Sequence, residues 1–152
     1  MNSSDILFIG DVFFSNNNDK YIFLDRIRHQ LKNYLVIAPD QRGYSSGARP
    51  SKIKDYKINK LTKDIIDIAD AFKLTNFHLV GHDWGAAVGW VMSSMFKNRI
   101  ISYSALSVPH LDAFSKAISN DKIQKKKSYY KTQTCLKGKK KDTLSLQLIQ
   151  KL

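Results

Sequence analysis

The stretch Phe77-His78-Leu79-Val80-Gly81-His82-Asp83-Trp84-Gly85 contains the features that decide the fold. The apolar run from Phe77 to Val80 is ended by Gly81 and predicts a buried strand. The residues from Trp84 to Phe96 are mostly apolar and predict a buried helix. A strand that leads directly into a helix is the repeating unit of a parallel sheet covered by helices.

Segments on either side repeat this alternation of strand and helix. Helices are predicted over 20–31 and 61–72, and the second has an apolar face made of Leu61, Ile65, Ile68, Ala69 and Phe72. Further strands are predicted over 6–9, 34–38 and 100–108, with loops over 13–19 and 40–50. The pattern predicts an α/β fold, with a mostly parallel sheet and helices on both of its faces.

The five residues Gly81-His82-Asp83-Trp84-Gly85 match the pattern of a nucleophile on a sharp strand-to-helix turn, with aspartate in the position usually held by serine. The flanking glycines allow backbone and helix to approach closely. The N-terminus of the following helix favours the anionic form of Asp83. The alternative is an ordinary turn in which the Asp83 side chain caps the helix.

Three segments together resemble the epoxide-hydrolase branch of the α/β-hydrolase family. They are Ala38-Pro39-Asp40-Gln41-Arg42-Gly43-Tyr44-Ser45, the stretch from Phe77 to Trp90, and Leu106-Ser107-Val108-Pro109-His110 with Ala113-Phe114. Their order and separation match the family over about residues 6 to 130. Haloalkane and haloacetate dehalogenases share much of this pattern and remain an alternative.

The resemblance implies roles for individual residues. Asp83 would open a small apolar epoxide, or displace a halide, and form an alkyl ester that water then hydrolyses. The backbone N–H of Trp84 would contribute to the oxyanion hole, its indole could hold a halide, and His82 would have a supporting role. Asp11 lies where the family has its second backbone donor, although the stretch Ile9-Gly10-Asp11-Val12 departs from the family's His-Gly-x-Pro motif. No cofactor and no metal are implied.

The resemblance also predicts the domain organisation. Residues 1–112 would form the N-terminal part of the hydrolase core, 113–131 the start of a cap, and 132–152 a Lys-rich tail that is disordered or non-native in sequence. The family's catalytic acid and histidine base have no counterpart in this sequence. A non-catalytic, truncated remnant is therefore the alternative to an active hydrolase, and a complementing C-terminal half or self-association is expected.

Four histidines are candidates for the missing base. His29 falls on the predicted surface of the helix over 20–31, and His78 in a strand is expected to be a hydrogen-bonded core residue. His82 lies beside Asp83, and His110 follows the strand over 100–108, near the mouth of the site. We expect none of the four to act as the base.

Composition limits the remaining possibilities. All thirteen acidic residues are aspartates and the net charge is +12, concentrated in residues 113–152, which hold eleven lysines and two aspartates. This basic end is either solvated or binds an anionic surface, and no nucleic-acid motif accompanies it. A single cysteine, Cys135, indicates a reducing compartment. With no signal peptide and no membrane-length apolar run, the expected location is cytoplasmic, with no membrane association.

Overall fold

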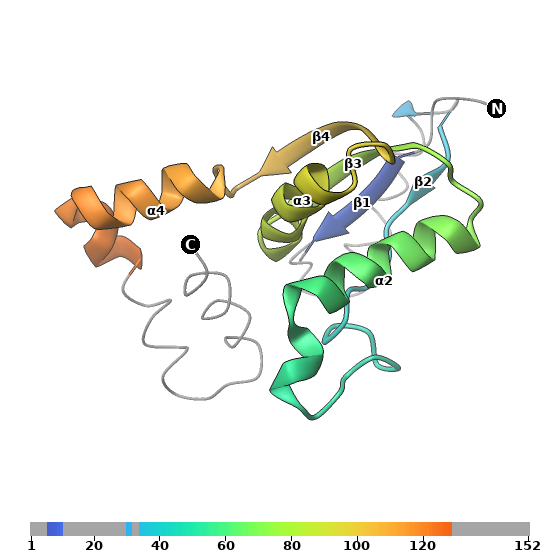
Figure 1. The fold of residues 1–152 in the computed structure, drawn as a ribbon, viewed down its shortest axis with the longest axis horizontal. Helices are drawn as coiled ribbons and strands as arrows, with labels where there is room; N and C mark the ends of the chain where they lie inside the picture. Colours follow the sequence, from blue (N-terminus) through green and yellow to red (C-terminus); the bar gives the residue numbers. More distant parts are fainter. Residues whose placement is uncertain (1–5, 11–29, 32–33, 129–152) are drawn as a thin grey trace.

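The computed structural model describes residues 6–10, 30–31 and 34–128, which form a four-stranded parallel sheet (Figure 1). The strands lie in the order β2-β1-β3-β4, so β1 and β3 occupy the centre. Their bounds are β1 Ile6–Gly10, β2 Val36–Ile37, β3 Phe77–His82 and β4 Ile100–Leu106. The parallel pairing of β1, β3 and β4 confirms the predicted sheet.

Helices cover the sheet through an apolar core. Helix α3 (Trp84–Met95) contacts β1, β3 and β4, and α2 (Ile58–Ala71) packs beside α3. The core side chains have almost no exposure because the central strands are nearly continuous apolar runs. They include Leu7, Ile9, Leu61, Ile65, Ala69, Phe77, Leu79, Val88 and Met92.

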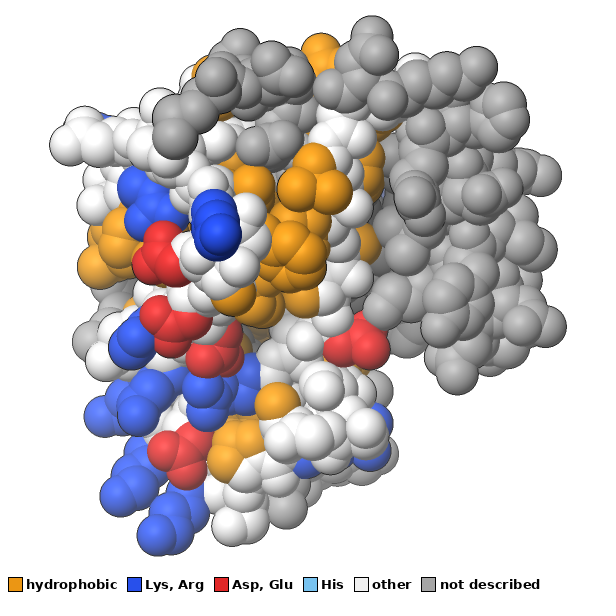
Figure 2. All heavy atoms as spheres, turned by 90° about the vertical axis from the view of Figure 1, so that its right-hand side faces the viewer, with side chains coloured by type: hydrophobic (Ala, Val, Ile, Leu, Met, Phe, Trp, Pro, Cys, Tyr) orange, Lys and Arg blue, Asp and Glu red, His pale blue; other side chains and the backbone are white. Residues whose placement is uncertain are grey.

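Helix α2 differs from its prediction at both ends. It begins at Ile58, after a short 3-10 turn η1 (Ile53–Tyr56), and ends at Ala71. Phe72, predicted on the apolar face, is 53% exposed because the helix has ended before it. The face at the C-terminal end of α2 shows hydrophobic side chains gathered beside a column of acidic and basic ones (Figure 2).

All four strands differ in length from their predictions, and β1 includes Gly10 beyond the predicted 6–9. Only Val36 and Ile37 of the predicted 34–38 pair with β1, and Tyr34 and Leu35 are exposed. Strand β3 continues through Gly81 to His82, because both still pair with β1. Strand β4 ends at Leu106, since Ser107 has a positive φ of 67° that breaks the extended backbone. The helix predicted over 20–31 lies outside the described residues except for its last two.

Helix α4 (Leu111–Asn120) leaves the end of β4 and extends away from the sheet (Figure 1). None of its residues is buried. On β4 itself, Ile101 and Leu106 are each 45% exposed. Among the described strands β4 has a neighbour on one side only. The division at residue 112 and the cap over 113–131 stay predictions, and the tail over 132–152 lies outside the described residues.

Candidate active site

Asp83 is the single residue between β3 and α3, and its backbone is strained. Its φ of 48° and ψ of −116° match the first central residue of a type II′ turn, a position that favours glycine. The Asp83 N–H donates to the Leu106 carbonyl of β4 at 3.2 Å, and the Asp83 carbonyl accepts from Ala87 N–H at 3.2 Å. A strained non-glycine residue persists only where surrounding structure over-determines it. This geometry matches the sharp strand-to-helix turn predicted from the sequence, and we call residues 81–85 the elbow.

The side chain of Asp83 does not cap the helix. Asp83 occupies the N-cap position of α3, but its carboxylate makes no capping hydrogen bond with the helix. The side chain is half-buried at the carboxyl edge of the sheet, where α/β proteins bind ligands. The simpler interpretation of Asp83 as a capping residue is therefore not supported.

The strain predicts an unusual order of stability at position 83. Asp83→Gly is expected to be more stable to unfolding than Asp83→Ala by about 1–2 kcal/mol, because only glycine relieves the backbone strain. At Asp67, an exposed position within α2, alanine should instead be the more stable by about 1 kcal/mol. Urea unfolding of the four variants checks the reversal, and alanine being more stable at both positions would contradict it.

Gly81 lets the first turn of α3 approach β3. A Cβ at this position would lie 2.7 Å from the Gly85 carbonyl oxygen and 2.8 Å from the Ala86 Cα, both closer than real contacts allow. These neighbours are backbone atoms that no change of rotamer can move. Close packing of α3 against β3 thus requires glycine at position 81, two residues before the predicted nucleophile Asp83.

Gly81→Ala is expected to lower the free energy of unfolding by about 1–2 kcal/mol, because the added methyl group overpacks a rigid contact. Gly47→Ala is the control, since its Cβ would meet no atom within 4 Å. Urea unfolding of both variants measures the difference. Equal stability of the two variants would show that β3 and α3 can separate without cost.

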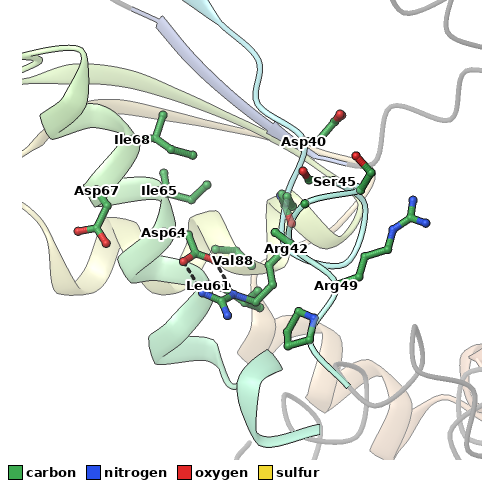
Figure 3. A pocket seen from close by; sticks show the side chains of 15 residues that line it. Asp40, Arg42, Ser45, Arg49, Leu61, Asp64, Ile65, Asp67, Ile68 and Val88 are labelled. Atoms are coloured by element: carbon green, nitrogen blue, oxygen red, sulfur yellow. Dashed lines mark hydrogen bonds and ion pairs between the residues drawn. The ribbon is translucent and has the colours of Figure 1, made fainter. Parts of the chain in front are cut away.

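A cavity of about 760 Å³ lies elsewhere, between the loop over 40–50 and α2 (Figure 3). Its apolar wall consists of Leu61, Ile65, Ile68 and Val88. Neither Asp83 nor Trp84 lines it. Three aspartates line the cavity, and each already has a partner: Asp64 pairs with Arg42, Asp67 pairs with Lys63, and Asp40 also takes part in an interaction. We therefore place the candidate chemistry at Asp83 rather than in this cavity.

That ion pair joins Arg42 to Asp64 in a bidentate arrangement. Arg42 Nε donates to Asp64 Oδ2 at 2.7 Å and Arg42 Nη2 donates to Oδ1 at 2.6 Å. Both side chains are mostly shielded, at 23% and 29% exposure, and the hydrogen bond to Asp64 raises the pKa of Arg42. Figure 3 shows Arg42 reaching from the loop to the helix. Sequence analysis missed this pair because the partners are 22 residues apart and belong to no local pattern.

Comparison with known proteins decides the family. A family model described as alpha/beta hydrolase fold matches residues 15–146. The chain belongs to the alpha/beta hydrolase fold family. This confirms the fold class predicted from the sequence, and several relatives within the family are epoxide hydrolases.

Two curated relatives illustrate the similarity. Epoxide hydrolase A of Mycobacterium tuberculosis is 42% identical over 89 residues, which cover 55% of this chain and 28% of that protein. Epoxide hydrolase 2 of Caenorhabditis elegans is 34% identical over 110 residues, covering 72% of this chain and 31% of that protein. The matched regions thus span about a third or less of these relatives.

Solved structures give the same result. An epoxide hydrolase of Bacillus megaterium, crystallised with an inhibitor, superimposes with a TM-score of 0.74 at 27% identity, covering 86% of this chain and 45% of that one. An epoxide hydrolase from Vigna radiata has a TM-score of 0.60 at 32% identity, over 71% of this chain and 34% of that one. The chain is therefore an epoxide-hydrolase-like alpha/beta hydrolase that spans less than half of these structures.

The other predicted site residues are only partly described. Trp84 is the first residue of α3, so its backbone N–H lies directly after Asp83, as an oxyanion donor would. Asp11, the predicted second donor, lies outside the described residues. Among the described residues, no group of histidine, cysteine and acidic side chains could hold a metal ion, and no helix is long and apolar enough to cross a membrane.

Each described histidine has an interaction partner. His78 lies on the less buried side of β3, with its Nδ1 2.7 Å from Ser102 Oγ, so the prediction of a core histidine is wrong about its burial but right about its hydrogen bond. His110 caps α4 by accepting from Asp112 N–H at 3.3 Å. His82 is half-buried at the end of β3 and also has an interaction partner. His29 lies outside the described residues, and the absence of a local base stays a prediction.

Proposed function

We propose that Asp83 is the nucleophile of an epoxide-hydrolase-like reaction on a small apolar epoxide. The single observation that carries the proposal is the Asp83 carboxylate, held on a strained turn at the N-terminus of α3 with no capping hydrogen bond. The names of the relatives supply the substrate class. A carboxylate can attack an epoxide carbon directly, without a base to remove a proton from a hydroxyl nucleophile.

In the first step, a carboxylate oxygen of Asp83 attacks one ring carbon of the epoxide. A new carbon–oxygen ester bond forms as the ring carbon–oxygen bond breaks, and the ring oxygen leaves as an alkoxide that takes a proton from water or an acid. The product is a hydroxyalkyl ester of Asp83. The positive end of the α3 dipole stabilises the carboxylate, and no capping hydrogen bond occupies the carboxylate oxygens.

In the second step, water attacks the ester carbonyl carbon and releases a diol. The backbone N–H of Trp84 would stabilise the tetrahedral oxyanion, and a base must take the proton of the attacking water. His78 and His110 already make hydrogen bonds within the fold, His82 has an interaction partner, and the sequence pattern assigns none of them as the base. We therefore propose that the 152-residue chain by itself completes the first step and accumulates the ester.

Counting product molecules tests this proposal. The purified chain is incubated with an excess of an aryl epoxide, and both the diol and the intact protein mass are followed with time. We expect one adduct for each chain and no continuing release of diol. Repeated release of diol would overturn the proposed arrest at the ester, and absence of any adduct would overturn the proposed nucleophile.

A primary alkyl halide provides the comparison with dehalogenase chemistry. Attack by Asp83 on such a substrate gives an alkyl ester of the same type and releases one halide ion. The proposed preference is for the epoxide, so the epoxide should form the adduct faster. Faster adduct formation from the halide would instead favour the haloalkane dehalogenase alternative.

A further inference from the structure

Tyr103 on β4 makes a close polar contact with the first turn of α3. Its phenol O–H donates to the Ala86 carbonyl oxygen at 2.6 Å. Ala86 is two residues beyond Trp84, so this contact is made where the predicted oxyanion donor begins the helix. Most hydrogen bonds of α3 run within the helix, whereas this one ties its first turn to the sheet.

The Tyr103 ring reaches Ala86 only because residue 89 is glycine. A Cβ at Gly89 would lie 2.5 Å from Tyr103 Cε2 and 2.7 Å from Cζ. Glycine within a helix lowers stability relative to alanine, and no neighbouring residue in the sequence accounts for a glycine at position 89. The space it leaves is filled by the distal half of the tyrosine ring.

The Tyr103 ring also packs against Trp90. The two ring centroids are 5.0 Å apart with an interplanar angle of 85°, an edge-to-face arrangement. Trp90 in turn donates from Nε1 to the Val108 carbonyl at 3.3 Å and packs against His110. Tyr103 thus contacts three residues of α3, and one of them, Trp90, is itself held by the segment that follows β4.

Strand β4 therefore holds the elbow at two points. The Leu106 carbonyl accepts from the N–H of Asp83, and the Tyr103 hydroxyl donates to Ala86. Between them lie the strained backbone of Asp83 and the N–H of Trp84. Backbone strain persists only where surrounding contacts hold it. Strand β4 supplies two such contacts, one at Asp83 itself and one three residues later at Ala86.

We propose that Tyr103, seated against Gly89, is a positioning residue that locks the first turn of α3 onto β4 and so sets the direction of the Asp83 carboxylate. Its effect on the reaction rests on the proposed function, but the lock itself does not. Burial raises the pKa of the Tyr103 hydroxyl, which remains a protonated donor across the working pH range.

A double-mutant cycle tests the lock without any activity. Gly89→Ala should lower the urea midpoint of the natural chain, because the new methyl group displaces the ring. In a Tyr103→Leu background the same change should raise the midpoint, since leucine lacks the distal ring atoms and alanine is the better helix former. A lowered midpoint of similar size in both backgrounds would overturn the proposed seat of Tyr103.

The positioning role is tested by Tyr103→Phe, which removes only the hydroxyl. The matched control is Tyr56→Phe, because the Tyr56 hydroxyl also donates to a backbone carbonyl, that of Pro50 at 3.0 Å, away from the elbow. We expect Tyr103→Phe to slow ester formation on Asp83 about tenfold, as misplaced reacting groups do, and to speed amide exchange at Ala86 and Ala87. Tyr56→Phe should change neither.

Equal rates of ester formation for Tyr103→Phe and Tyr56→Phe would overturn the positioning role. If the natural chain forms no ester, the proposed function fails instead. The reversal at Gly89 and the amide exchange at Ala86 then still decide whether the lock exists. The two failures are therefore distinguishable.

Discussion

Asp83→Asn is expected to lose ester formation by about a thousandfold or more, because an amide is not a nucleophile under these conditions. The fold should survive, since asparagine is among the residues that best tolerate a positive φ. Loss of the negative charge at the N-terminus of α3 should lower the free energy of unfolding by no more than about 1 kcal/mol. Intact-mass measurement of the epoxide adduct, together with urea unfolding, checks both expectations.

Asp112→Asn is the control for Asp83→Asn. Asp112 also lies at a helix N-terminus, in the first turn of α4, and its side chain is 72% exposed. It should keep the natural rate of ester formation. Equal loss in both variants would show that charge at helix ends, rather than the Asp83 carboxylate itself, controls the reaction.

Arg42→Met is expected to lower the free energy of unfolding by about 2–3 kcal/mol, because it leaves the Asp64 carboxylate mostly shielded and without its cation. The substitution also removes the two hydrogen bonds by which Arg42, in the loop over 40–50, is joined to Asp64 of α2. Because the hydrogen bond raises the pKa of Arg42, the guanidinium stays charged in the folded protein at every practical pH. The stabilisation of the folded state by Arg42 is lost only above the unfolded-state pKa of arginine. The decrease in unfolding free energy caused by Arg42→Met should therefore be the same at pH 6 and at pH 9, as far as the charge of Arg42 is concerned.

Lys63→Met is the control for Arg42→Met, since Lys63 pairs with Asp67 on the same helix but both side chains are well exposed. We expect no measurable change in unfolding for this variant. The double variant Arg42→Met with Asp64→Leu should recover part of the lost stability, because it removes the stranded charge. Equal losses for Arg42→Met and Lys63→Met would show that the shielded pair contributes no more than an exposed one.

The elbow and the central strands could be predicted because their signals are local. The run from Phe77 to Val80, the glycines at 81 and 85, and the apolar helix that follows are adjacent in the chain. Burial on both faces of a central parallel strand requires a continuous apolar run, and such runs are visible without tertiary information. Asp83 therefore appears in the structure on the turn that its sequence pattern predicts.

Other features depend on partners distant in sequence and could not be predicted. Arg42 meets Asp64, and Tyr103 meets Ala86, across separations of 22 and 17 residues. Gly89 lies within an apolar helix, and a glycine there indicates that another group packs closely against the helix. The sequence does not indicate that this group is the ring of Tyr103. The early end of β4 depends on the positive φ of Ser107, which no pattern of serine predicts.

The predicted ends of helices and strands were wrong where an apolar residue lies just beyond the element. Phe72 continues the helical spacing of α2 but follows its last residue, and Tyr34 and Leu35 continue the apolar run before β2 but lie outside that strand. Periodicity describes which face a residue would occupy if the element continued. Hydrogen bonding decides whether it does continue, and that depends on neighbouring strands and loops.

The most direct test of the central claim is the position of the adduct. The natural chain is treated with an aryl epoxide, digested, and each modified peptide is sequenced by fragmentation. We predict a single ester on Asp83 that is absent from Asp83→Asn. Modification at Cys135, at a histidine or at scattered aspartates, with Asp83 unmodified, would contradict the assignment of Asp83 as the nucleophile.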